Sequence, residues 1–254
     1  MWWWWLVACG GPCGDDKPCK VDGGSYYVVA PDDWDGREAL PVAVYFHGYN
    51  NTAEGQLDRS TSQELRAAGW LTVFPDGVDQ TWANVGSPSQ ARDEIPFTEA
   101  VLDDVEASFP VDRVVVSGFS QGSSMAWDAA CYLPDRFEAL LGASGSFWQP
   151  EPTRCTGPVA VRHTHGTQDG VMPLEGRPIG SYHQGSVEVG FAAWRATNGC
   201  AEAPDEVVER GPETCEVWSS CTSGQPLERC LYDGGHSRPN GWTERMLDWV
   251  ASLP

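Results

Sequence analysis

Short apolar runs alternate along the chain with longer segments whose apolar residues recur at helical spacing. The runs are bounded by glycine, proline or polar residues, a pattern that predicts β-strands. Most of the longer segments end just before a glycine or a proline, which is typical of helices. We expect strands over 25–30, 42–47, 70–75, 113–118, 138–144, 158–166 and 229–234, and helices over 60–68, 97–108, 121–131, 186–198 and 241–252.

This alternation predicts an α/β fold with a mostly parallel sheet and helices on both faces. Functional residues in such a sheet lie at the carboxyl ends of the strands. The 254 residues, of which 41% are hydrophobic, suffice for a substantial core. Because no linker or internal repeat divides the sequence, we expect one domain over residues 20–254. A cysteine-containing segment, residues 1–19, precedes it.

One serine lies between two glycines in the stretch VVVSGFSQGSS, residues 114–124. Gly118 and Gly122 lack the Cβ atoms that would clash in a tight strand-to-helix bend, with Ser120 at its tip. The spacing matches G-x-S-x-G, the nucleophile elbow, although a glycine-rich turn without chemistry gives the same letters. The valine strand before the motif and the helix after it favour Ser120 as a nucleophile.

A serine nucleophile needs a histidine base, which a carboxylate orients. In the elbow fold these residues follow in the order serine, acid, histidine. His236 follows the last predicted strand beside two glycines, and we expect it to be the base. His163 and His165 lie within a predicted strand, where structural contacts are expected, and His183 lies in a polar loop.

The acid is expected in HGTQDGVMP, where Asp169 occupies a turn between the serine and the histidine; Glu175 is the alternative. The oxyanion of the tetrahedral intermediate needs backbone donors. We expect one from Gln121, which follows the serine, and one from Tyr49 in the HGYNN loop, with Asn50 as the alternative. His47 is expected to brace that loop.

The net charge limits which partners the protein can bind, and the cysteine content indicates its cellular compartment. A net charge of −20 disfavours nucleic acid, anionic membrane surfaces and polyanionic substrates. Of nine cysteines, eight are enough for four disulfides, which indicates an extracellular or periplasmic protein. Without a C-x-x-C pair a zinc cluster is not expected, and neither is any other metal or cofactor. We expect a monomer.

The ninth cysteine raises the question of a membrane anchor. Cys9 ends the sequence LVAC, which resembles the lipobox of bacterial lipoproteins, so lipidation at Cys9 and anchoring to the outer membrane is one interpretation. The other is a stray cysteine beside a miscalled start codon.

Several motifs together resemble the polyhydroxybutyrate depolymerase and feruloyl esterase group of secreted α/β-hydrolases. They are YFHGYNN, VFPDGV followed by TWAN, SGFSQGSSMAW, HGTQDGVMP, FAAWRATNGC and GGHSRP, within residues 20–254. The resemblance implies a serine esterase with Ser120, Asp169 and His236 as its triad. The sequence has no insertion long enough to form a large lid over such a site, so we do not expect one. This chain departs from the group at Gln121, where asparagine is common, and at Arg238, where tryptophan is common.

The same resemblance implies disulfides Cys200–Cys230 and Cys215–Cys221. That leaves Cys131–Cys155 and Cys13–Cys19, although the sequence alone keeps the connectivity open.

Trp82 and Trp148 follow strand ends, so each either lines the cleft and binds an acyl group or caps the core. We expect an extracytoplasmic serine esterase acting on small or polymer-linked esters of short or aromatic acids. The alternatives are a depolymerase of hydroxyalkanoate polyesters, an acetylxylan esterase, and a catalytically silent surface lipoprotein that only binds.

Overall fold

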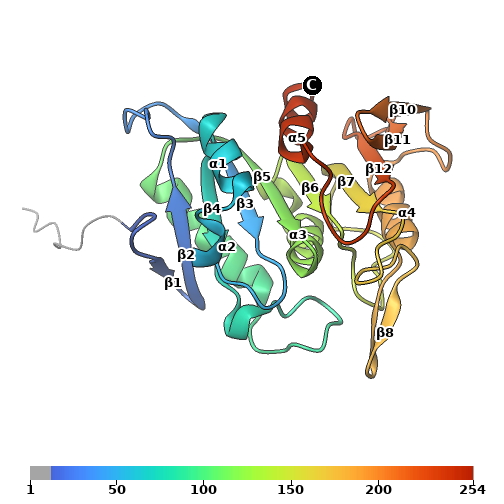
Figure 1. The fold of residues 1–254 in the computed structure, drawn as a ribbon, viewed down its shortest axis with the longest axis horizontal. Helices are drawn as coiled ribbons and strands as arrows, with labels where there is room; N and C mark the ends of the chain where they lie inside the picture. The colour runs from blue at the N-terminus through green and yellow to red at the C-terminus, as the bar shows by residue number, and fades with distance from the viewer. Residues whose placement is uncertain (1–12, 254) are drawn as a thin grey trace, which may run out of the picture.

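The computed structural model describes residues 13–253 and contains one large mixed sheet (Figure 1). Ten strands follow the order β1-β2-β4-β3-β5-β6-β7-β12-β11-β10. The strands from β4 to β12 pair in parallel, and the pairs at both edges are antiparallel. Their bounds are β1 Cys19–Val21, β2 Gly24–Val29, β3 Leu40–Phe46, β4 Leu71–Pro75, β5 Val111–Phe119, β6 Ala139–Ala143, β7 Ala160–Gly166, β10 Glu206–Arg210, β11 Glu213–Trp218 and β12 Leu227–Tyr232.

Helices cover both faces of this sheet, because successive side chains of a strand point to opposite sides. Val114 and Val116 of β5 pack in one core with residues of α2, α3 and α4. Val115, between them, packs in a second core with residues of α1 and α5. The helices are α1 Ser60–Ala67, α2 Glu94–Ser108, α3 Gln121–Tyr132, α4 Val187–Asn198 and α5 Trp242–Ala251. The predicted α/β fold is confirmed.

The seven predicted strands and five predicted helices are present, with ends shifted by up to three residues. The largest shift is at α2, which begins at Glu94 because the Asp93 side chain accepts a hydrogen bond from the Ile95 N–H at the helix start. The sequence did not predict β1, β10 and β11, nor the small hairpin of β8 Arg177–Ile179 and β9 Tyr182–Gln184. Among residues 13–253, no helix is long and apolar enough to cross a membrane. Cys9 lies outside the described residues.

Two of the four expected disulfides are wrong. Cys215 and Cys230 lie directly opposite each other in the antiparallel pair of β11 and β12, with Cα atoms 4.0 Å apart. That register joins them to each other, so Cys200, just after α4, pairs with Cys221, its Cα 4.1 Å away. The other two pairs are as expected: Cys131–Cys155 and Cys13–Cys19.

Candidate active site

Ser120 lies at the tip of the turn between β5 and α3. Its backbone has φ 60° and ψ −129°, a conformation that non-glycine residues adopt only where the surrounding structure imposes it. A Cβ at Gly118 would overlap the Gly122 backbone, and a Cβ at Gly122 would overlap the Phe46 carbonyl. The Ser120 N–H donates to the Ala143 carbonyl of the adjacent strand, 3.0 Å away. The two glycines and this hydrogen bond therefore fix the position of the serine side chain.

Three loops at the carboxyl ends of β5, β7 and β12 bring Ser120, Asp169 and His236 together. The His236 Nε2 atom is 2.8 Å from Ser120 Oγ, and its Nδ1 atom is 2.7 Å from Asp169 Oδ2. Because an ionised carboxylate only accepts, Nδ1 carries the proton and Nε2 is free to accept the serine O–H. This hydrogen-bonded arrangement is the one by which a base activates a serine.

The acid is held in an ionised state by its own turn. Asp169 Oδ1 accepts from the N–H groups of Val171 and Met172, at 2.9 Å and 2.8 Å. Burial acts to raise the pKa of Asp169, but hydrogen bonds from Met172, His236 and Val171 outweigh it, so the pKa is lowered. Glu175, the alternative acid, is exposed, and His236 bonds to Asp169.

The loop after β3 lies over the serine. A Cβ at Gly48 would be 3.6 Å from Ser120 Cβ, so this loop contacts Ser120 closely. The Asn50 N–H donates to the Gln80 carbonyl at 2.9 Å, which argues against it as an oxyanion donor. Gln121 follows Ser120 and Tyr49 follows Gly48, and their N–H groups remain the expected donors.

His47 braces this loop, as expected. Its ring is buried, and its Nε2 atom accepts from the Gly77 N–H at 3.0 Å. The Nδ1 atom is 2.9 Å from the Gly48 carbonyl and must therefore be the donor. Burial lowers the pKa of His47, which keeps the ring neutral and this pair of bonds intact near neutral pH.

Of the two roles expected for Trp82 and Trp148, their burial supports packing in the core and argues against substrate binding. Trp82 is wholly buried, and its indole N–H donates to the His47 carbonyl, so it supports the loop from beneath. Trp148 is only 6% exposed, and its backbone forms an antiparallel β-bridge with Gln184 of β9. The aromatic ring that the sequence analysis missed is Tyr49, 73% exposed on the loop that contacts Ser120.

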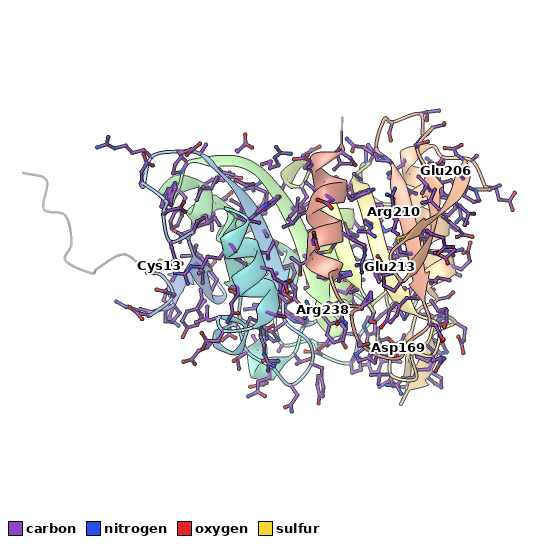
Figure 2. The ribbon with its side chains drawn as sticks, turned by 45° about the horizontal axis from the view of Figure 1, so that its top comes forward. Cys13, Asp169, Glu206, Arg210, Glu213 and Arg238 are labelled. Atoms are coloured by element: carbon purple, nitrogen blue, oxygen red, sulfur yellow. A yellow bond between two sulfur atoms is a disulfide. The ribbon has the colours of Figure 1, made fainter. Side chains whose placement is uncertain are left out.

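Arg238, two residues after the base, packs away from the triad loop toward α1 and α5. Its guanidinium donates to the Tyr45 and Thr61 hydroxyls and lies 5.5 Å from the Phe119 ring centre. Figure 2 shows Arg238 beside one end of α5, apart from Asp169. The Phe119 ring also contacts the His236 ring, with centres 4.9 Å apart. Arg238 thus supports a side chain that packs on His236.

Three further arginines form ion pairs with two buried glutamates. Arg162, on β7, is 1% exposed and pairs with Glu213 and Glu228 at 3.0 Å and 2.9 Å. Arg210 and Arg245 reach the same two carboxylates from β10 and α5. Figure 2 shows Arg210 and Glu213 at the terminal strands, away from Arg238. This network holds the edge strands onto the sheet.

The chain is similar to fungal enzymes and to solved esterase structures. A family model described as Phospholipase/Carboxylesterase matches residues 90–186. "Probable feruloyl esterase C" from Aspergillus clavatus is 30% identical over 235 residues, covering 87% of this chain and 79% of that protein. "Feruloyl esterase B" from Piromyces equi is 26% identical, covering 84% of this chain and 42% of that protein.

Two solved structures share the fold. "Acetyl xylan esterase from Aspergillus awamori" superposes with a TM-score of 0.68 at 15% identity, covering 89% of this chain and 93% of that one. An esterase named PE8 has a TM-score of 0.60 at 17% identity, covering 93% and 100%. With the fold, the serine turn and the relatives in agreement, the chain belongs to the feruloyl esterase group of α/β-hydrolases and is a carboxylic ester hydrolase.

Proposed function

We propose that this enzyme cleaves esters of aromatic or short acyl groups, linked to saccharides or to small alcohols, through Ser120, His236 and Asp169. The observation that carries the proposal is the pair of hydrogen bonds at 2.8 Å and 2.7 Å that join the three side chains. The strained serine turn and the lowered pKa of Asp169 support the same assignment.

The geometry supports a two-step acyl transfer. Ser120 Oγ attacks the ester carbonyl carbon while His236 Nε2 takes the serine proton, and Asp169 stabilises the imidazolium that forms. We expect the Gln121 and Tyr49 N–H groups to bind the oxyanion. When the intermediate collapses, the C–O bond to the alcohol breaks and His236 gives its proton to the leaving oxygen. His236 then deprotonates a water molecule that attacks the acyl carbonyl carbon. As the bond from that carbon to Ser120 Oγ breaks, His236 returns the proton to Oγ and the free acid is released.

Tyr49 supports an aromatic acyl group as the substrate. Its ring is the large exposed apolar surface on the loop over the serine, and stacked aromatic pairs contribute about 0.5 to 1.5 kcal/mol. The relatives named as feruloyl esterases favour the same chemistry. Acetylxylan and hydroxybutyrate esters are the competing substrates, and a silent binding protein is disfavoured by the assembled hydrogen bonds.

A fluorophosphonate probe tests the nucleophile, since it reacts only with an activated serine. Wild-type enzyme and Ser123→Ala, a matched change one helical turn further, should be labelled, and Ser120→Ala should not. Labelling of Ser120→Ala at the wild-type rate would refute the assignment.

A substrate panel tests the acyl group. Methyl ferulate, acetylated xylan and hydroxybutyrate oligomers are compared for wild type, Tyr49→Phe and Tyr49→Ala. Tyr49→Ala should lower kcat/KM for methyl ferulate about 3- to 10-fold, Tyr49→Phe should not, and acetate release from xylan should be unchanged. An equal loss on all three substrates would remove the stacking role.

The same four disulfides support an extracellular or periplasmic enzyme, because such bonds persist in oxidising compartments. Intact-mass measurement of the protein purified from the membranes and the medium of its native host would show whether Cys9 carries a lipid.

A further inference from the structure

Two buried histidines lie directly behind the triad acid. His165 and His163 are both on β7 and wholly buried, and because they are two residues apart they lie on the same face of the strand. The His165 Nε2 atom is 2.6 Å from the Met172 carbonyl oxygen and 3.5 Å from Asp169 Oδ2. The His163 Nε2 atom is 3.0 Å from His165 Nδ1. A continuous polar chain therefore runs from His163 to the acid turn.

The chemistry of the partners fixes one proton arrangement along this chain. A carbonyl oxygen only accepts, so His165 Nε2 carries a proton and donates it to Met172. Its Nδ1 then accepts from His163 Nε2–H. Burial lowers the pKa of both rings. At His165 the Met172 hydrogen bond and the Asp169 charge act to raise the pKa, but burial outweighs them. Both histidines are therefore neutral donors and acceptors of fixed direction near neutral pH.

Met172 connects this chain to the triad. Its N–H donates to Asp169 Oδ1 at 2.8 Å, while its carbonyl accepts from His165. The turn from residue 169 to residue 172 is thus held on both sides, and Asp169 Oδ2 is left facing His236. A rotation of this turn would move Oδ2 and break the bond to the base.

The inner histidine is itself fixed in place. The Trp127 ring of α3 packs edge-on against His163, with ring centres 5.1 Å apart. Gly142 lies opposite His163 on the adjacent strand β6. A Cβ at Gly142 would lie 2.7 Å from His163 Nδ1, so glycine is required there for the ring to fit. His163 consequently holds the His165 ring in its donating orientation.

We propose that His165 is a positioning residue for ester hydrolysis, which aims the Asp169 carboxylate at His236 by anchoring the Met172 carbonyl. The proposal rests on the triad proposed above. His165 does not touch the substrate; its effect passes through Asp169.

A double-mutant cycle tests this role on the full-length, oxidised enzyme. His165→Phe keeps a flat ring without the N–H donor and should lower kcat about 10- to 100-fold with KM within about twofold, because a small displacement of a catalytic group has effects of this size. His165→Gln places an amide N–H near the same point and should recover activity to within about fivefold of wild type. Adding His165→Phe to Asp169→Asn should lower kcat by less than about twofold, because effects that pass through one residue do not add.

The outcomes separate the two proposals. If Asp169→Asn retains wild-type activity, the triad assignment is wrong. If Asp169→Asn is impaired while His165→Phe is fully active, or loses as much in the Asp169→Asn background as in wild type, the positioning role is wrong. Circular dichroism monitors folding of every variant. Should His165→Phe not fold, His163→Phe, which removes only the inner donor, is expected to lower kcat with KM retained, and full activity in that variant would equally overturn the proposal.

Discussion

A buried carboxyl group beneath the active-site loops should make the stability of this enzyme depend on pH around neutrality. Asp128, on α3, is 2% exposed, and its Oδ2 atom accepts from the Asn84 side-chain N–H at 3.2 Å and the Val85 backbone N–H at 3.1 Å. It thereby fastens the loop after Trp82 to α3, the helix that begins just after Ser120. Burial raises the pKa of Asp128 from about 3.8 to about 7, against the opposing effect of these two hydrogen bonds.

Whether stability rises or falls with pH depends on whether the folded or the unfolded protein binds the Asp128 proton more tightly. A carboxyl whose pKa is higher in the folded protein stabilises the fold below its unfolded pKa, and that stabilisation is lost as pH rises through the folded pKa. A difference of about 3 units, at 1.36 kcal/mol each, gives about 4 kcal/mol lost between pH 4 and pH 8. Asp128→Asn keeps the shape and removes the titration, so the variant should gain stability relative to wild type as pH rises.

Urea denaturation from pH 5 to pH 9 measures this difference. The free energy of unfolding of Asp128→Asn, minus that of wild type, should rise with pH by up to about 1.4 kcal/mol per unit and level off above pH 8. Asp248→Asn, the same change at an exposed position of α5, serves as the control and should follow wild type. A constant difference between Asp128→Asn and wild type across this range would refute the reasoning.

Three other expectations follow from the structure. Intact-mass measurement of the oxidised region from Cys13 onward should show eight hydrogens fewer than the reduced form, and two or more free thiols would contradict the pairing. Replacing Cys200 and Cys221 by serine should lower the free energy of unfolding, measured by urea denaturation, by about 2 to 5 kcal/mol. Because the pKa of Asp169 is lowered in the folded protein, its carboxylate stabilises the fold above the unfolded pKa, and this contribution is lost as pH falls below about 4. The thermal midpoint of wild type should therefore fall toward that of Asp169→Asn in acid. With a net charge of −20, kcat/KM for an ester on an acidic sugar should rise with salt while kcat/KM for methyl ferulate stays flat. A higher kcat/KM for the acidic ester than for methyl ferulate at low salt would contradict this reasoning.

The central part of the fold could be predicted from the sequence because its strands are buried on both faces. Val114, Val115 and Val116 read as one apolar run, since alternate residues enter different cores. The hairpin of β10 and β11 could not be predicted in the same way. Its residues include exposed glutamates, and its place in the sheet depends on pairing with β12, a contact between distant parts of the chain. The same long-range register decided the partner of Cys215.

Chain order was enough to nominate the three triad residues, whereas side-chain exposure was not predictable. Trp82 and Tyr49 both follow strand ends, so sequence position treats them alike. Packing separates them, because the Trp82 indole N–H finds the His47 carbonyl in the interior while the Tyr49 ring projects from the loop above. An aromatic residue in a loop can therefore be assigned to the substrate only after its polar atom and its exposed area are known.

The active-site loops share one construction principle: a buried polar group beneath each loop holds its backbone. His47 bonds the loop over the serine to the loop at Gly77, Asp128 holds the loop after Trp82, and His165 holds the acid turn. Leaving either partner of such a buried hydrogen bond unpaired costs about 1 to 3 kcal/mol, so each loop is held in the conformation that keeps the bond. The surfaces that would meet substrate, such as the Tyr49 ring, project outward from this fixed layer. Substitutions in the outer layer should therefore change substrate preference, and substitutions in the buried layer should change turnover of every ester alike.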